Sequence, residues 1–139
     1  MKYLLDTCVL SELVKSAPSE QVINWFKEHQ SDEMFISAIS LAELLRGVAK
    51  LPESKRRNDL IIWIKKIEID FMDRILSFDQ NVAHSWSDMT ALTEVKGKSI
   101  AAFDSLIAAT AHMHDCYLVT RNVRDFVNSG VEIIDPWES

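Results

Sequence analysis

Short apolar runs alternate with helix-like segments along this chain, and this alternation most constrains its fold. Strand-like runs are predicted at residues 2–5, 34–37, 75–78, 117–120 and 131–134. Segments with helical spacing of apolar residues lie between them, at residues 9–15, 22–29, 40–49, 55–67, 79–92 and 103–114. Strands that alternate with helices form a mostly parallel sheet with helices on both faces. The sequence therefore predicts an α/β fold.

The length of the chain limits the number of domains. Its 139 residues match the size of one domain, and three Gly and three Pro provide little material for a flexible linker. We predict a single domain over residues 1–139. No secretion signal is visible, and no run approaches the roughly 18 apolar residues of a spanning helix. A cytoplasmic location without membrane contact is the expectation.

The formal net charge of −6 argues against a generic nucleic-acid coat protein, which would normally be basic. It is compatible with an enzyme that concentrates carboxylates at a metal site. The two cysteines, Cys8 and Cys116, lie far apart in the sequence, and neither belongs to a CxxC pair. We therefore predict buried free thiols and no structural zinc site.

Three acidic residues stand at or near the ends of predicted elements. Asp6 follows the first strand-like run, Glu43 lies in the helical segment that begins at Ser40, and Asp104 precedes an almost wholly apolar helical stretch. Each also has a structural interpretation, because Asp6 and Asp104 could cap helices and Glu43 could pair with Ser40 in a capping box. Together they lie at the edge where open α/β sheets place their sites. Clustered carboxylates repel one another unless a cation neutralises them, so Mg²⁺ or Mn²⁺ is expected there.

Other carboxylate-using α/β enzymes fit the sequence less well. A haloacid-dehalogenase-type phosphatase needs a second Asp two residues after its nucleophile, where this chain has Cys8. The acidic pair and the lysine of a receiver domain are not clear. A Walker-type phosphate loop and a GxGxxG motif are both missing from the sequence. The four histidines are scattered and suggest no Ser/His/Asp arrangement.

Four short motifs in order give the chain a family resemblance. They are YLLDT at residues 3–7, SAISLAEL at 37–44, FDSLIAATA at 103–111 and LVTRNVRDF at 118–126. Each is weak alone, but the four with this spacing are specific. The chain resembles PIN-domain nucleases, in particular the VapC/FitB-like toxins of bacterial type II toxin–antitoxin systems. The resemblance implies a three-layer α/β/α fold with a roughly five-stranded sheet and a Mg²⁺- or Mn²⁺-dependent endoribonuclease activity.

The resemblance also implies roles for individual residues. Asp6, Glu43 and Asp104 match the family's three core acids, with Asp6 and Asp104 holding the metal and Glu43 binding it directly or through water. The family often has a fourth acid where this chain has Asn122, and Asp125 is the alternative to it. The hydroxyls expected to orient the acids are those of Thr7, Ser40 and Thr120. The arginines expected to bind substrate are Arg46 and Arg121.

Partners follow from the same resemblance. Such toxins form homodimers, are inhibited by a cognate antitoxin and contact DNA only through it. A second hypothesis remains, in which the chain is a catalytically weak PIN-like binding module in a DNA-binding complex, and Asn122 is the feature that supports it.

Two further surfaces have both a functional and a structural interpretation. The basic residues of 55–66 are interpreted as the solvated face of a helix. Residues 25–26 and 61–64 could dock a partner, although ordinary core packing is the favoured interpretation.

Overall fold

Five parallel strands form one sheet at the centre of the molecule, in the order β3-β2-β1-β4-β5. The computed structural model describes residues 1–138. The strands are β1 (Lys2–Leu5), β2 (Met34–Ser37), β3 (Ile75–Leu76), β4 (Cys116–Val119) and β5 (Ile133–Ile134). Every neighbouring pair is parallel. The predicted α/β fold with a mostly parallel, five-stranded sheet is confirmed.

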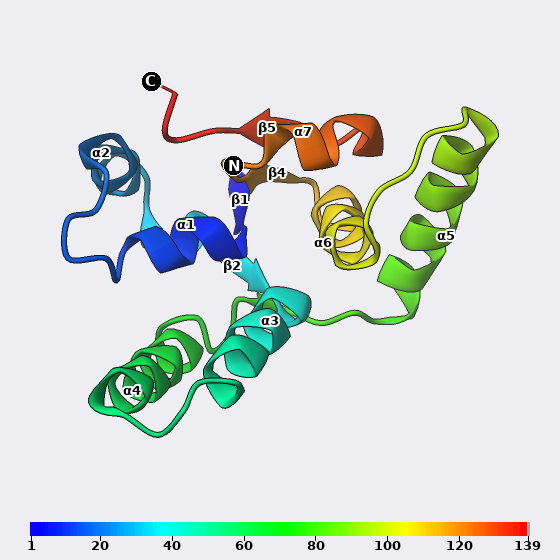
Figure 1. The fold of residues 1–139 in the computed structure, drawn as a ribbon. Coiled ribbons are helices and arrows are strands. Elements are labelled where there is room, and N and C mark those ends of the chain that lie inside the picture. Colours follow the sequence, from blue (N-terminus) through cyan, green and yellow to red (C-terminus); the bar gives the residue numbers. More distant parts are fainter. Residues whose placement is uncertain (139) are drawn as a thin grey trace.

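Helices connect the strands within residues 1–138. They are α1 (Thr7–Glu12), α2 (Glu20–Glu28), α3 (Ala38–Ala49), α4 (Lys55–Asp70), α5 (Gln80–Val95), α6 (Ala102–Met113) and α7 (Val123–Phe126), with 3-10 turns η1 (Ser31–Glu33) and η2 (Val127–Ser129). Figure 1 shows α1 and α2 on one side of the strands and α5 and α6 on the other. Crossover connections of this kind place helices on both faces of a parallel sheet.

Side chains alternate across the sheet and produce two cores. Tyr3 and Leu5 of β1 pack into a cluster with residues of α1, α2, α3 and α4. Leu4, between them, packs with residues of α5, α6 and α7. Alternation is required because successive side chains of a strand point to opposite faces. The molecule therefore has the expected three layers, helix–sheet–helix.

Apolar residues of α2 and α4 belong mostly to the first of these cores. Trp25 is 8% exposed and Ile64 is 2% exposed, whereas Ile62 is 66% exposed. Phe26, Ile61 and Trp63 are half-buried against the same cluster. Core packing, the favoured interpretation of these residues, therefore accounts for all of them except Ile62.

A side chain caps the start of each of the helices α3 and α5. The Asp79 carboxylate caps α5 by accepting a hydrogen bond from the Val82 amide at 3.0 Å. The predicted Ser40 cap of α3 is wrong, because Ser37 caps that helix and accepts from the Ile39 amide at 3.0 Å. Since β2 runs into α3 without a loop, Ser40 falls inside the helix and is fully buried. Glu43 is therefore not the capping-box partner of Ser40.

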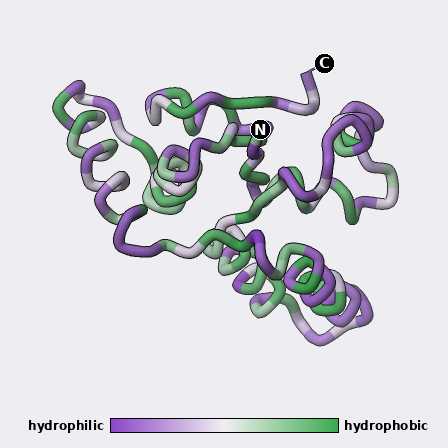
Figure 2. The backbone as a smooth tube through the Cα atoms, turned by 180° about the vertical axis from the view of Figure 1, so that it is seen from behind, coloured by the Kyte–Doolittle hydropathy of each residue, from purple (hydrophilic) through white to green (hydrophobic). Residues whose placement is uncertain are grey.

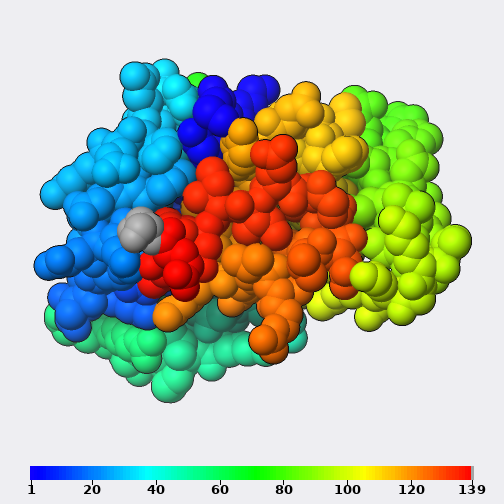
Figure 3. Space-filling view, turned by 90° about the horizontal axis from the view of Figure 1, so that it is seen from above, coloured from blue at the N-terminus to red at the C-terminus, as the bar shows by residue number. Residues whose placement is uncertain are grey.

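Figures 2 and 3 show the molecule from two further sides. Hydrophobic and hydrophilic residues are interspersed along the helices (Figure 2), and none of the helices in residues 1–138 is long and apolar enough to cross a bilayer. Figure 3 shows the C-terminal residues, in orange and red, lying between the blue N-terminal segment and the yellow-green α5 region. The C-terminal segment therefore lies across this face of the molecule.

Candidate active site at the carboxyl edge of the sheet

Asp6 directly follows β1 and is fixed by its neighbours. Its side chain is 5% exposed, and its Oδ1 accepts a hydrogen bond of 2.8 Å from the Thr7 amide, which caps α1. Its Oδ2 accepts another of 2.8 Å from the Thr120 hydroxyl at the end of β4. Because β1 and β4 are paired, their ends place these two residues together. The Thr120 hydroxyl therefore contacts Asp6 directly, and its role as a supporting hydroxyl stays a prediction.

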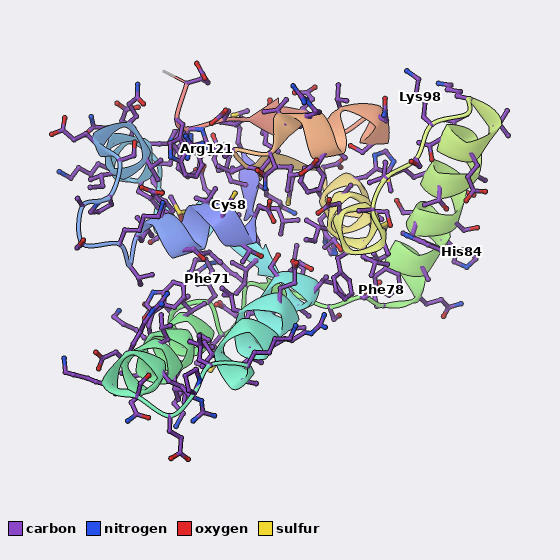
Figure 4. All side chains as sticks on the ribbon, viewed as in Figure 1. Cys8, Phe71, Phe78, His84, Lys98 and Arg121 are labelled. Carbon is purple, nitrogen blue, oxygen red and sulfur yellow. The ribbon has the colours of Figure 1, made fainter. Side chains whose placement is uncertain are left out.

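Cys8 is a neighbour of Asp6 for which the sequence predicted only a buried free thiol and no role at the site. Its thiol lies 3.7 Å from Asp6 Oδ2 and 3.5 Å from Thr120 Oγ1, and it accepts from the Arg121 amide at 3.5 Å. Figure 4 labels Cys8 and Arg121 in this region. Burial, and then the charge of Asp6, raise the pKa of the thiol, so it stays protonated and can donate to Asp6. Both cysteines are free thiols, Cys116 buried and Cys8 half-buried.

Glu43 reaches the same place from α3. Its Oε1 accepts a hydrogen bond of 3.3 Å from the Thr7 hydroxyl, which joins α3 to the first turn of α1. Burial raises the pKa of Glu43, and the negative charges of Asp6 and Asp104 raise it further. The Thr7 hydroxyl therefore contacts Glu43, and its role in orienting that acid stays a prediction.

Asp104 completes the group from the first turn of α6. Burial raises the pKa of this half-buried carboxyl, and the charges of Asp6 and Asp125 add to the effect. Within residues 1–138 its side chain makes no hydrogen bond, so both carboxylate oxygens remain free. Three acids that lie far apart in the sequence thus come together, close enough for the charge of Asp6 to raise the pKa of both Glu43 and Asp104.

The two candidates for a fourth acidic position differ in geometry. Asn122 is exposed, and its backbone amide donates to Thr120 Oγ1 at 3.0 Å. Asp125 lies one turn further, on α7, and is close enough to raise the pKa of Asp104. The charge that faces Asp104 from this segment therefore comes from Asp125.

The donor set of this site suits a hard divalent ion. Its ligands are carboxylate oxygens, which Mg²⁺ and Mn²⁺ prefer. Within residues 1–138, no three acidic, histidine or cysteine side chains already enclose a common point. Mg²⁺ usually retains several waters and uses only one or two carboxylates, so an open arrangement fits it. The Ser40 hydroxyl, one turn before Glu43, is fully buried with no partner in the described chain, and such a group calls for a water or ligand.

Comparison with known proteins gives the family. The PIN domain model matches residues 3–128. The chain belongs to the PIN-domain family. A VapC ribonuclease of Sinorhizobium fredii is 37% identical over 139 residues, which cover 97% of each chain. A chain of the FitAcB crystal structure from Neisseria gonorrhoeae is 37% identical, with a TM-score of 0.92 and 99% of each chain covered.

A further solved structure extends this similarity to a DNA-bound assembly. A chain of the structure of FitAB bound to an IR36 DNA fragment is 36% identical to this PIN domain and has a TM-score of 0.92. The match covers 99% of this chain and 96% of that one. The resemblance inferred from four short motifs is therefore confirmed over nearly the whole chain.

The two arginines expected near the acids of this PIN domain have different surroundings. Arg46 is exposed in the last turn of α3, and it forms no ion pair within residues 1–138. The guanidinium of Arg121 lies over the ring of Trp137, 5.2 Å from its centroid. Arg46 is thus free to move towards a ligand, whereas Arg121 already has an aromatic partner.

A groove of about 970 Å³ lies beside Glu43, with walls from α1, α3 and α4. Thr7 and Glu43 line it together with Lys55, Arg56 and Trp63. Much of the remaining lining is apolar. Lys55 is largely solvated and pairs with Asp59 at 3.5 Å, which agrees with the predicted solvated face. The groove nevertheless places Lys55 and Arg56 on a surface continuous with Glu43.

The Thr120 hydroxyl predicts a measurable stability effect. Thr120→Val keeps the shape of the side chain but leaves Asp6 Oδ2 without its 2.8 Å donor. Because the acceptor is charged, we expect a loss of about 2 kcal/mol in the free energy of unfolding, measured with urea. Thr110→Val is the matched control, since that buried hydroxyl donates only to the Leu106 carbonyl of its own helix. Equal losses in the two variants would contradict a special role for Thr120.

Proposed function

We propose that this PIN domain is a Mg²⁺- or Mn²⁺-dependent endoribonuclease toxin of a type II toxin–antitoxin pair. The observation that carries the proposal is the approach of Asp6, Glu43 and Asp104 from three separate elements, with raised pKa values at Glu43 and Asp104. Membership of a family whose relatives include a VapC ribonuclease supports the same activity. RNA is therefore the proposed substrate.

Asp6 and Asp104 would hold the ion, and Glu43 would bind it directly or through water. Three hydrogen-bond donors already occupy acceptor positions of Asp6, the Thr7 amide, the Thr120 hydroxyl and the Cys8 thiol. A carboxylate offers about four such positions, so Asp6 keeps room for one further contact. When bound, the ion would supply stabilisation of the negative charge that develops on the phosphodiester.

The side chains of this domain would orient and deprotonate the attacking water. Thr7 fixes Glu43 through Oε1 and leaves Oε2 free. A carboxyl with a raised pKa is a better base for water at neutral pH, so Glu43 Oε2 accepts the proton in this proposal. Asp125 adds negative charge beside Asp104, and Asn122 offers a neutral carbonyl at the same edge. Arg46 would contact substrate phosphates, and Arg121 would do so after leaving Trp137.

A cognate antitoxin is the proposed partner. The similar Neisseria gonorrhoeae chains come from FitAcB and DNA-bound FitAB structures. The largely apolar groove beside Glu43 offers a surface on which an inhibitory segment would block the acids. By the same analogy we propose a cytoplasmic homodimer that contacts DNA only through its antitoxin.

Cleavage of a mixed RNA pool by antitoxin-free protein tests the activity. We expect fragments with Mg²⁺ or Mn²⁺, none with EDTA, and none from Asp6→Asn with either metal. Circular dichroism would show that the variant is folded, since Asn also caps helices well. Failure of the folded wild-type protein to cut RNA with either metal would favour the alternative, a binding module within a DNA-bound complex.

A further inference from the structure

Asp104 depends on its helix for position more than the other acids do. The Asp6 carboxylate accepts three hydrogen bonds and Glu43 accepts one, whereas Asp104 accepts none within residues 1–138. The location of its carboxylate is therefore set by the first turn of α6. That turn lacks an ordinary cap, because Ala101 at its start has no side-chain oxygen.

A contact from α5 fixes this turn instead. The indole Nε1–H of Trp86 donates a hydrogen bond of 2.9 Å to Ser105 Oγ, the residue next to Asp104. The Ser105 hydroxyl in turn donates to the Ala102 carbonyl at 2.6 Å. Ser105 is 2% exposed, so its hydroxyl is shielded from water in both hydrogen bonds. Two hydrogen bonds in series thus join α5 to the turn that carries Asp104.

The arrangement of α5 suits this role. The α5 helix packs beside α6 at the outer edge of the molecule and contributes no acid to the cluster (Figure 1). Its Val82 and Met89 are buried in the same core as Ile107 and Ala108 of α6. Trp86 lies between these two anchors in sequence, on the same helix, and is 36% exposed. The indole N–H of Trp86 therefore has a specific partner in Ser105, and core packing of Val82 and Met89 holds the helix that carries it.

We infer that Trp86 is a positioning residue for the proposed metal site, because its indole N–H holds the α6 turn that places Asp104 beside Asp6. The inference rests on the proposed function, in that Asp104 is taken as a metal ligand. Outer-shell hydrogen bonds commonly alter metal affinity when removed, since they fix the ligand's orientation. Trp86 itself does not touch metal or substrate.

Mn²⁺ binding by the full chain tests the inference directly. Trp86→Phe removes the N–H donor and keeps an aromatic ring, and Trp25→Phe is the matched control in the other core. Isothermal titration with Mn²⁺ should give a dissociation constant raised roughly fivefold for Trp86→Phe and unchanged for Trp25→Phe. Hydrogen exchange should be faster at the Ser105 amide, which bonds to Ala101 O at 2.8 Å, in the metal-free Trp86→Phe protein.

A double-mutant cycle separates positioning from general destabilisation. If Trp86 acts through Ser105, Trp86→Phe with Ser105→Ala should weaken Mn²⁺ binding no more than the larger single change does. Wild-type Mn²⁺ affinity in Trp86→Phe, or fully additive losses, would overturn the inference. Weakened binding in Trp86→Phe with no RNA cleavage by the wild type would leave the inference standing and reject the nuclease. A wild-type chain that binds no Mn²⁺ would overturn both.

Discussion

Asp104→Asn is expected to lower metal-dependent RNA cleavage by about a thousandfold and, without metal, to stabilise the fold. Cleavage is expected to slow because the change removes the charge of a proposed metal ligand. Stabilisation of the transition state by the metal is worth several kcal/mol, and about 1.4 kcal/mol corresponds to a tenfold change in rate. The gain follows because Asp104 makes no hydrogen bond within residues 1–138 that the change would break. Its charge only repels Asp6, Glu43 and Asp125.

Both effects of Asp104→Asn can be measured on one preparation. Initial cleavage rates at saturating Mn²⁺ give the loss, and urea unfolding at pH 7 in EDTA gives the change in the free energy of unfolding. Asp88→Asn is the control, because Asp88 is an exposed carboxylate of α5 that forms no ion pair within residues 1–138. A destabilised Asp104→Asn protein in EDTA would show that Asp104 supports the fold and would weaken its assignment to function.

The strands could be predicted from the sequence because their signal is local. Residues 2–5 and 34–37 are short apolar runs, and both form strands with those bounds. The predicted segment 79–92 also corresponds to α5, which ends at Val95, before Gly97 with its φ of 69°, a conformation that favours glycine. Parallel pairing then places the residues that follow β1 and β4 at one edge. The approach of Asp6 and Thr120 was therefore predictable in principle.

Other parts of the site depend on contacts that no local pattern encodes. Helix α7 has only four residues, too few for a periodic pattern, yet it brings Asp125 towards Asp104. Ser37 and Ser40 both precede helical residues. Ser37 is the cap of α3 because β2 passes directly into that helix, with no loop between them. Arg121 rests on Trp137, whose position depends on the C-terminal segment. The sequence could place the acids at one edge, but not the neighbours that Asp104 and Arg121 have in the folded chain.

The raised pKa values make the stability of the metal-free protein depend on pH in a definite direction. Carboxyls whose pKa is raised on folding favour the protonated folded state, so this contribution is fully present below their unfolded pKa of about 4. It is lost as pH rises through the raised pKa values of Glu43 and Asp104. In EDTA, the free energy of unfolding should therefore decrease as the pH rises from weakly acidic to neutral, because these two groups lose their protons.

Metal binding should reverse this loss and raise Tm by about 10 °C at pH 7. A ligand at a hundredfold excess over its dissociation constant stabilises the folded state by ~2.7 kcal/mol, and about 1 kcal/mol shifts Tm by roughly 4 °C for a chain of this size. Differential scanning fluorimetry with Mn²⁺ or EDTA at matched ionic strength measures the shift. At pH 4 the increment should nearly vanish, because protons compete for the same oxygens. An equal shift in Asp104→Asn would place the ion away from the acidic cluster, because the variant lacks one of the charges that attract it.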